Sequence, residues 1–497
     1  MRTVVLMWAA SCCVSFAFAD DPVRLTFSVS DAAGKPSPCR IHLSGSDGMP
    51  VKPEGLPFWR DHFCCDGSAD VDVEPGTYRY AIERGPEHER VNGAIDVAVG
   101  NVNRVTGKLG RIANLGGDGW YSGDLHVHRS PQEIELLMRA EDLDVAEVIT
   151  WWNTNNLWKN RDLPAERPTS FDGRRYYDVV AGEDERDGGA LLYFQLPRPI
   201  EITKATRDAP SSVVFAREAR QSPGVWLDIE KPFWWDAPMW LALGLGDSIG
   251  IANNHMNRST VMGNEAWGHP RDLSRYPGID GNGLWTQDIY YHALNCGIRI
   301  PPSAGSASGV LPNPVGYNRV YVRVDGDLTW EKWWEGLKAG RCFVTNGPLL
   351  RVRANGKQPG HVFRQDGREP LVVRLEGEIT SNDPVRAVEL VQNGRVERIE
   401  LPATIEIREP GWFLVRVIAD VDETFRFAST GPFYVERGED QRPVRSESAR
   451  FFLDWTRQRI AALREKALAD ETTVLAPWLE AEGFWEARLE MAEKDSR

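Results

Sequence analysis

Hydrophobic and polar positions along this chain change their spacing several times, and each change indicates a different kind of element. Residues 22–112 alternate apolar and polar positions in short runs, as at 25–29 and 69–73, with Gly, Pro and Asp turns between them. Because successive side chains of a strand point to opposite faces, this alternation is typical of half-buried strands. It predicts a small N-terminal β-sandwich over residues 20–115.

From Gly119 onward, short apolar strands alternate with helical segments, which is the βαβ pattern of a parallel sheet or barrel. The predicted strands cover residues 123–127, 145–150, 177–182, 191–194, 225–229, 248–252, 298–301 and 320–324. The predicted helices cover residues 131–142, 213–220, 237–244, 285–295 and 329–339. This spacing predicts a closed or distorted α/β barrel of about seven or eight units over residues 116–348.

After residue 348 the alternation with period two returns, at 371–375, 386–392 and 413–418. Asn393-Gly394 lies between two such runs and is a strong signal for a tight hairpin turn. These features predict a second β-sandwich over residues 349–440.

Residues 446–495 carry a broad apolar stripe at helical spacing, which predicts an amphipathic helical tail over residues 441–497. We expect this tail to pack on the barrel rather than to bind a partner. The predicted fold class is therefore multidomain α/β plus β: a distorted (β/α)7–8 barrel, flanked by two β-sandwiches and followed by helices.

The first residues have the layout of a cleavable export signal, in which Met1-Arg2 precede an apolar run and an Ala17-Phe18-Ala19 step. We expect residues 1–19 to be removed and the mature protein to be periplasmic or extracellular. Lipid attachment at Cys12 is the alternative, although the residue three before it is Ala9 rather than Leu. No later stretch approaches the roughly 18–20 apolar residues that a membrane helix needs.

Charge and cysteine content narrow the choice of partners. The net charge of −14 argues against a nucleic acid, because phosphate binding depends on basic side chains. The cysteines that follow the predicted signal are Cys39, Cys64, Cys65, Cys296 and Cys342. An oxidising compartment would allow Cys39 to pair with either Cys64 or Cys65, and the sequence does not choose between them.

The most informative stretch for chemistry is Gly-Asp-Leu-His-Val-His at residues 123–128. His126 and His128 are two apart on a predicted strand, so both imidazoles point to one face at the end of the barrel, where barrel enzymes assemble their sites. Two such imidazoles can chelate one divalent ion without rearranging the backbone. The alternative is a pair of surface histidines.

Several blocks together carry a resemblance to a known family. They are Asp124-Leu-His-Val-His128, Ala181-Gly-Glu-Asp-Glu185, Gly316-Tyr-Asn-Arg-Val-Tyr321 and Phe343-Val-Thr-Asn-Gly-Pro-Leu349. Over residues 119–350 the chain resembles the CehA/McbA branch of the PHP (polymerase and histidinol phosphatase) superfamily. The N-terminal turns Asp31-Ala-Ala-Gly-Lys-Pro36 and Pro75-Gly-Thr-Tyr78 resemble those of carboxypeptidase-regulatory-like or other immunoglobulin-like modules. The first resemblance implies a distorted barrel that holds one to three divalent ions and hydrolyses bonds such as aryl carbamate esters. It also implies that His126, His128 and Glu183 are metal ligands.

Three segments depart from the family pattern. Trp-Trp-Asn at 151–153, Glu-Lys-Pro at 230–232 and Gly-Ser-Ala-Ser-Gly at 305–309 stand where that family usually has further metal ligands. We therefore expect a single ion, Zn²⁺ or Mn²⁺, because a hydrolytic metal typically needs three protein ligands and an open position for water. His255, after another predicted strand, is the candidate for a fourth ligand, and the alternative is a histidine hydrogen-bonded among neighbouring asparagines.

Charged residues near these segments are candidates for catalysis. Asp228 and Glu230 alternate on one face of a predicted strand and would ligate the ion or act as general base; the alternative is two ordinary strand-end acids. The ammonium of Lys231, with Arg186 or Arg258, would polarise an ester, carbamate or phosphoryl oxygen. The alternative for Lys231 is a salt bridge with Glu230.

Other side chains are expected to orient the ligands or to contact the substrate. Asp124 would accept a hydrogen bond from a ligating imidazole. The residues expected at the substrate are Trp151, Trp152, Asn153, Asn254 and Arg186, with Trp234-Trp235 as a further aromatic wall. Such a pocket favours an aromatic or sugar-like substrate over a small anion.

The sequence thus predicts an exported, metal-dependent hydrolase of ester, carbamate or phosphoester bonds, with catalytic residues Asp228, Glu230, Lys231 and Arg258. The alternative is a catalytically degenerate barrel that binds a glycan or a partner at the cell envelope through its tryptophans and asparagines. The missing ligands favour this alternative, and the histidine pair favours the enzyme.

Overall fold

The computed structural model describes residues 22–495 except 368, 439–442, 467 and 469. The predicted export signal, with Cys12, lies outside the described residues. In the described part of the chain, no helix is both long enough and apolar enough to cross a membrane.

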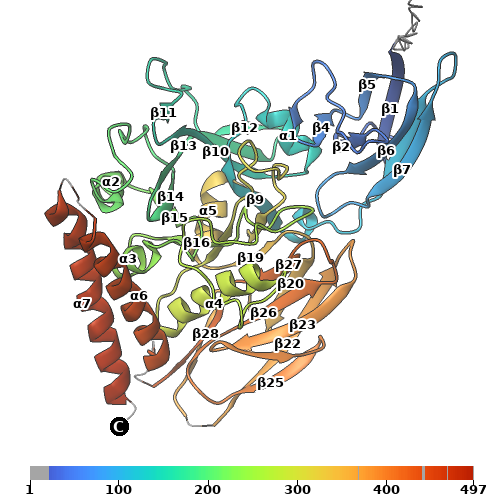
Figure 1. Ribbon diagram of the computed structural model, residues 1–497. Helices are drawn as coiled ribbons and strands as arrows, with labels where there is room; N and C mark the ends of the chain where they lie inside the picture. The colour runs from blue at the N-terminus through green and yellow to red at the C-terminus, as the bar shows by residue number, and fades with distance from the viewer. Residues whose placement is uncertain (1–21, 368, 439–442, 467, 469, 496–497) are drawn as a thin grey trace, which may run out of the picture.

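Two sheets form the N-terminal unit, at one end of the molecule (Figure 1). The three-stranded sheet has the order β5 (Ser68–Val73), β1 (Val23–Asp31), β8 (Arg104–Leu109). The five-stranded sheet has the order β3 (Phe58–Trp59), β4 (His62–Cys65), β2 (Cys39–Ser44), β6 (Gly76–Glu83), β7 (Val91–Val97). Alternate residues of both sheets, such as Phe27 and Ile41, share one core. The period-two pattern places these side chains inside.

The central region begins with β9, which follows a short 3-10 turn at Gly116–Asp118. Its main strands are β9 (Trp120–Val127), β10 (Val145–Trp152), β13 (Arg175–Arg186), β14 (Gly189–Phe194), β15 (Trp226–Ile229), β16 (Ser248–Ala252), β17 (Pro302–Ala304), β18 (Arg319–Arg323) and β19 (Cys342–Thr345), with the short β11 (Asn155–Asn156) and β12 (Thr169–Phe171). Its helices are α1 (Ile134–Ala140), α2 (Ser212–Ala219), α3 (Ala237–Ala242), α4 (Gly281–Asn295) and α5 (Trp330–Lys338). The five helices and most strands lie close to predicted segments, although β17 begins four residues later than expected and β11, β12 and β19 were not predicted.

Strand directions in this region are mixed. β9, β10 and β13 are parallel neighbours, and so are β15, β16 and β17. β14 runs antiparallel to both β13 and β15, and β18 runs antiparallel to β9. Only two residues, Asp187 and Gly188, separate β13 from β14, and a parallel connection needs a crossover of a dozen or more residues. The sheet therefore differs from that of a regular α/β barrel, in which all strands are parallel.

The C-terminal strands extend the central sheet. β19 pairs with β27, so the sheet is continuous across the predicted domain boundary at residue 348, and its pairings close on themselves. The strands that join it are β21 (Val362–Gln365), β23 (Val385–Gln392), β24 (Arg395–Arg398), β26 (Gly411–Ala419), β27 (Phe427–Thr430) and β28 (Phe433–Arg437). A separate sheet of β20 (Leu349–Ala354), β22 (Leu371–Thr380) and β25 (Ala403–Ile407) covers a second core with them. The hairpin at Asn393-Gly394 is confirmed: it joins β23 to β24, and both turn residues have positive φ.

The chain ends in two helices that lie side by side, α6 (Ser446–Arg464) and α7 (Glu471–Asp495), drawn in red in Figure 1. Trp455, Trp478 and Trp485 are buried in the same core as the central strands. The Trp485 indole N–H donates to the carbonyl oxygen of Pro238, over 3.1 Å, at the start of α3. The expectation that the apolar stripe packs on the central region is confirmed.

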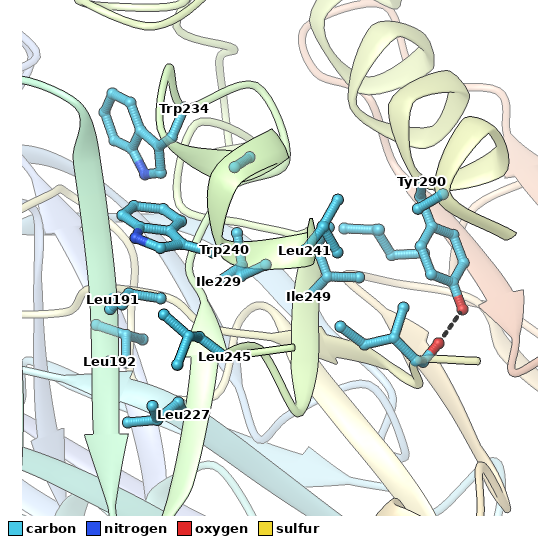
Figure 2. Packing of buried hydrophobic residues seen from close by; sticks show 14 of the residues in the cluster. Leu191, Leu192, Leu227, Ile229, Trp234, Trp240, Leu241, Leu245, Ile249 and Tyr290 are labelled. Atoms are coloured by element: carbon cyan, nitrogen blue, oxygen red, sulfur yellow. Dashed lines mark hydrogen bonds between the residues drawn. The ribbon is translucent and has the colours of Figure 1, made fainter. Parts of the chain in front are cut away.

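Large apolar side chains fill the space around β14, β15 and β16. Figure 2 shows Leu191, Ile229 and Ile249 from these three strands packed in one layer with Trp240 of α3. Tyr290 of α4 is fully buried, and its hydroxyl donates to the Ile300 carbonyl oxygen over 2.8 Å (Figure 2). Burial of this apolar surface, at about 25 cal/mol per Å², holds in register the strands that carry the candidate site.

Candidate metal centre

His126, in β9, and His128, directly after its end, lie against each other. Their Nε2 atoms are 2.9 Å apart, and their ring centroids are 4.9 Å apart. The segment after β17 holds the strand end: the Ala307 N–H donates to the His126 carbonyl oxygen, and the His128 N–H donates to the Ser308 carbonyl oxygen, each over 2.7 Å. The backbone therefore fixes where both imidazoles point.

Glu183 brings a carboxylate to the same place from β13, which is separated from β9 by β10. Its Oε2 lies 3.4 Å from His126 Nε2 and 3.1 Å from His128 Nε2. The side chains of His126, His128 and Glu183 are 3%, 8% and 4% exposed. The structure thus brings together, from two strands, the three side chains that the sequence proposes as ligands.

These three atoms suit a small divalent ion. Zinc binds imidazole nitrogen and carboxylate oxygen at about 2.0–2.2 Å, so ligand atoms around a tetrahedral ion lie about 3.3 Å apart. The separations of 2.9, 3.1 and 3.4 Å among the three atoms are close to that value. Two imidazoles and one carboxylate are also a donor set that zinc uses in hydrolytic sites, with a remaining position for water.

The other ring nitrogen of His126 faces a second carboxylate. Its Nδ1 lies 3.3 Å from Glu230 Oε1. A neutral imidazole has one N–H and one lone pair, so when Nδ1 donates to Glu230, Nε2 directs its lone pair toward His128 and Glu183. A carboxylate behind a ligating histidine commonly fixes the ring and its tautomer in this way.

Glu230 is itself held by several donors. Its Oε2 accepts from the Trp234 indole N–H, and its Oε1 accepts from the Asn254 side-chain amide, both over 2.9 Å. The Lys231 ammonium pairs with Oε1 and lies 4.6 Å from the centroid of the Trp234 ring. The alternative reading of Lys231, a salt bridge with Glu230, is thus what the structure contains.

Charges in the group explain its pKa shifts. Burial lowers the pKa of His126, but the carboxylates of Glu183 and Glu230 outweigh burial and raise it to about 10. Burial raises the pKa of Glu183, but the two imidazoles outweigh it and lower that pKa to about 2. Burial lowers the pKa of His128. The carboxylates of Glu183 and Glu230 thus favour a positive charge at His126, whereas burial disfavours one at His128.

Two further predicted residues lie near this group but have other partners. Asp228 Oδ1 accepts from the hydroxyls of Ser248 and Ser303, and burial raises the pKa of Asp228 to about 6. Among the described residues, His255 does not belong to the converging set of ligand atoms. Its ring packs 5.1 Å from that of Phe233, and burial followed by the charge of Lys231 lowers its pKa to about 3.

The prediction that Asp124 accepts a hydrogen bond from an imidazole is wrong, because its carboxylate oxygens accept from main-chain N–H groups instead. Its Oδ1 accepts from the main-chain N–H groups of His126 and Ser306, each over 3.0 Å, and its Oδ2 accepts from the N–H of Gly316 over 2.6 Å. Asp124 therefore ties the backbone of β9 to the later loop. The imidazole-facing position belongs to Glu230.

The aromatic residues after β10 divide between the site and the core. The Trp152 ring lies 5.0 Å from the His128 ring, and its indole N–H donates to Glu185 Oε2 over 3.1 Å. Asn153 Oδ1 accepts from the Glu185 N–H over 3.0 Å. Trp151 is 1% exposed and donates to the Val180 carbonyl oxygen, so it packs in the core and does not wall a pocket.

Glu185 is a neighbour of the site that was not predicted. It lies two residues after Glu183 on β13, so it points to the same face. Burial, followed by the charges of Glu183 and Glu230, raises its pKa to about 7. The period of two along the strand was a signal that would have found it.

Two predicted cations lie away from the histidines. Arg186 is on the face of β13 opposite to Glu183, where it pairs with Asp184 over 2.7 Å and lies over the Phe215 ring. Arg258 pairs with Glu83 of the N-terminal unit, at a cavity of about 520 Å³ between the N-terminal, central and C-terminal strands. Neither guanidinium is positioned to polarise a bond at His126, because each is held by a carboxylate elsewhere.

A second group of possible ligands, His42, Asp61 and His62, lies in the N-terminal unit and was not expected. The Asp61 carboxylate oxygens lie 3.1 Å from His42 Nδ1 and 2.8 Å from His62 Nδ1. The Arg40 Nε–H donates to His42 Nε2 over 2.9 Å. Since arginine keeps its proton, Nε2 must hold the lone pair of His42 and Nδ1 the proton, so His42 has no lone pair to offer a metal beside Asp61. The geometry therefore favours the group on β9 and β13.

Comparisons with known protein families, with characterised proteins and with solved structures find no match for this chain. Function is therefore argued from the geometry of the site and its chemistry.

Proposed function

We propose that this chain is an exported, metal-dependent hydrolase with a single divalent ion, Zn²⁺ or Mn²⁺, bound by His126, His128 and Glu183. The observation that supports the proposal is the convergence of two imidazole nitrogens and one carboxylate oxygen, all buried, within 3.4 Å of one another. Convergence of this kind costs stability unless a cation or shared protons offset the crowding of acceptors.

A bound ion would supply a coordinated water of lowered pKa and would polarise the oxygen of an ester, carbamate or phosphoester. The chain's own residues prepare that position. Glu230 holds the Nδ1 proton of His126, and the donors around Glu230 keep its carboxylate in place. Trp152, beside His128, offers a flat apolar surface with its N–H already paired, which favours an aromatic or sugar-like substrate.

The experiment compares metal-stripped protein with protein restored with Zn²⁺ or Mn²⁺, using 4-nitrophenyl acetate, an aryl carbamate and bis(4-nitrophenyl) phosphate as substrates. We expect hydrolysis of at least one class to return with the ion and to fall to background in His126→Ala. His361→Ala is the matched control, because His361 lies on the loop before β21 and packs on Phe363, away from the site. Equal activity in the stripped and restored protein would contradict the proposal.

The second candidate is a barrel that binds a glycan or partner without catalysis. The observation that favours it is the low exposure of the three ligand side chains, 3–8%, because structural metal sites are closed whereas catalytic sites keep an open position. A protein that binds one ion tightly, loses stability without it and hydrolyses none of the three substrate classes would support this candidate instead.

A further inference from the structure

Two cysteines face each other across neighbouring strands of the N-terminal unit. Cys39 begins β2 and Cys65 ends β4, and the antiparallel register places the two residues directly opposite each other. Their Sγ atoms lie 3.8 Å apart, and both residues are buried, with 0% and 1% exposure. Cα atoms of opposed antiparallel residues are about 4.5–5.5 Å apart, which is within the range that a disulfide spans.

The neighbouring Cys64 points the other way. Adjacent residues of a strand face opposite sides, and Cys64 packs with Val127 of β9 and Ile134 of α1, whereas Cys39 and Cys65 belong to the core of the sandwich. The structure thus separates the two pairings that the sequence leaves open, because only Cys65 shares a face with Cys39.

We propose that Cys39 and Cys65 are the site of an intrachain disulfide, formed when the chain folds in an oxidising compartment. The Sγ atoms need to approach from 3.8 Å to about 2.05 Å, a change that side-chain rotation and small strand adjustments supply. This proposal does not depend on the metal centre or on hydrolysis.

The reaction is thiol–disulfide exchange with a small disulfide such as oxidised glutathione. The Cys65 thiolate attacks one sulfur of that oxidant, forming a mixed disulfide and releasing one thiol. Cys39 then loses its proton and attacks the Cys65 sulfur, which forms the Cys39–Cys65 bond and releases the second thiol. Two electrons pass from the cysteines to the oxidant. In the folded chain the hydrogen bond between the two thiols lowers the pKa of Cys65 and raises that of Cys39.

The bond would close a loop that docks the N-terminal unit on the central region. Within residues 39–65, the Trp59 indole N–H donates to the Leu311 carbonyl oxygen over 2.7 Å, and Arg40 pairs with Glu141 after α1. Leu311 lies three residues after Ser308, the partner of the His128 backbone. A covalent link at the base of this loop would therefore hold the docking contacts in place.

The test refolds the full chain from denaturant in a glutathione redox buffer, then alkylates the remaining thiols in denaturant and maps peptides without reduction. We expect a peptide pair linked through Cys39 and Cys65, with Cys64, Cys296 and Cys342 alkylated. Cys64→Ala is the matched control and should keep the link, whereas Cys65→Ala should lose it without a new link to Cys64.

The thermal unfolding temperature of the chain without substitutions is a second measurement. The oxidised protein should unfold its N-terminal unit several degrees above the same protein after reduction, because the link restricts the unfolded chain. Free thiols at both Cys39 and Cys65 after refolding in the oxidising buffer, or a link between Cys39 and Cys64, would overturn the proposal.

Discussion

Replacing Glu230 tests whether the carboxylate behind His126 prepares that imidazole for a metal. Glu230 Oε1 is 3.3 Å from His126 Nδ1 and is the acceptor that assigns the proton to that nitrogen. In Glu230→Ala the acceptor disappears, so His126 is free to carry its proton on Nε2, where the metal would bind. Loss of such a partner typically weakens metal binding by about 10–100-fold, which is about 1.4–2.7 kcal/mol.

The Lys231 ammonium complicates this substitution, because it would lose its carboxylate in a site where its side chain is 4% exposed. Leaving one member of a buried pair alone costs about 3–5 kcal/mol of stability. The double variant Glu230→Gln/Lys231→Met removes both charges and keeps an oxygen that faces Nδ1. We expect it to unfold at a higher urea concentration than Lys231→Met alone and to bind Zn²⁺ within a few-fold of the original chain.

The assay is competition for Zn²⁺ against a chromophoric chelator at fixed pH, with urea unfolding of each variant alongside. Glu265→Ala is a matched control, since Glu265 is a buried carboxylate paired with Arg271 and an asparagine, Asn282, away from the histidine pair. It should lose stability and keep its affinity for zinc. Equal zinc affinity in Glu230→Ala, Glu265→Ala and the original chain would contradict a role for Glu230 in preparing His126.

Two further predictions concern pH and packing. Burial lowers the pKa of His62 to about 3 from the ordinary 6.5, so between these values the unfolded chain binds a proton that the folded chain does not. The stability of the N-terminal unit should therefore fall as pH drops from 6.5 toward 3, and this group should contribute at most about 1.4 kcal/mol per pH unit. Hydrogen exchange of the β2 and β4 amides measures this stability, and its fall with pH should be less steep in His62→Gln. At Gly182 a Cβ would lie 1.7 Å from the Trp151 ring. Gly182→Ala should therefore lower the free energy of unfolding in urea by about 1–3 kcal/mol and weaken zinc binding at the adjacent Glu183. Gly263→Ala is the control and should have neither effect, because a Cβ there would meet nothing within 4 Å.

Local patterns predicted much of the fold, because alternation and helical spacing depend on burial alone. The strand with His126 and His128, the turn at Asn393-Gly394 and the apolar stripe of the tail all lie where their patterns place them. The direction of β14 could not be predicted from these patterns, since it depends on a link of only two loop residues that makes β14 antiparallel to β13.

Site residues could be predicted where the alternation of side chains along one strand determines which face they share. They could not be predicted where segments distant in the sequence meet. Alternation along β13 places Glu183 and Arg186 on opposite faces, which argues against Arg186 as a substrate residue. Register shifts in β10 obscure whether Trp151 or Trp152 faces His128. The pairing of Arg258 with Glu83 joins residues 175 positions apart, a contact that no local pattern encodes.

Anomalous diffraction at the zinc edge, from crystals of the full chain equilibrated with Zn²⁺, would locate the bound ion. We expect one strong peak about 2.0–2.2 Å from His126 Nε2, His128 Nε2 and a Glu183 carboxylate oxygen, with Nδ1 of His126 still facing Glu230. A peak at His42, Asp61 and His62 with none at the β9 histidines, or no peak at either group, would contradict this expectation.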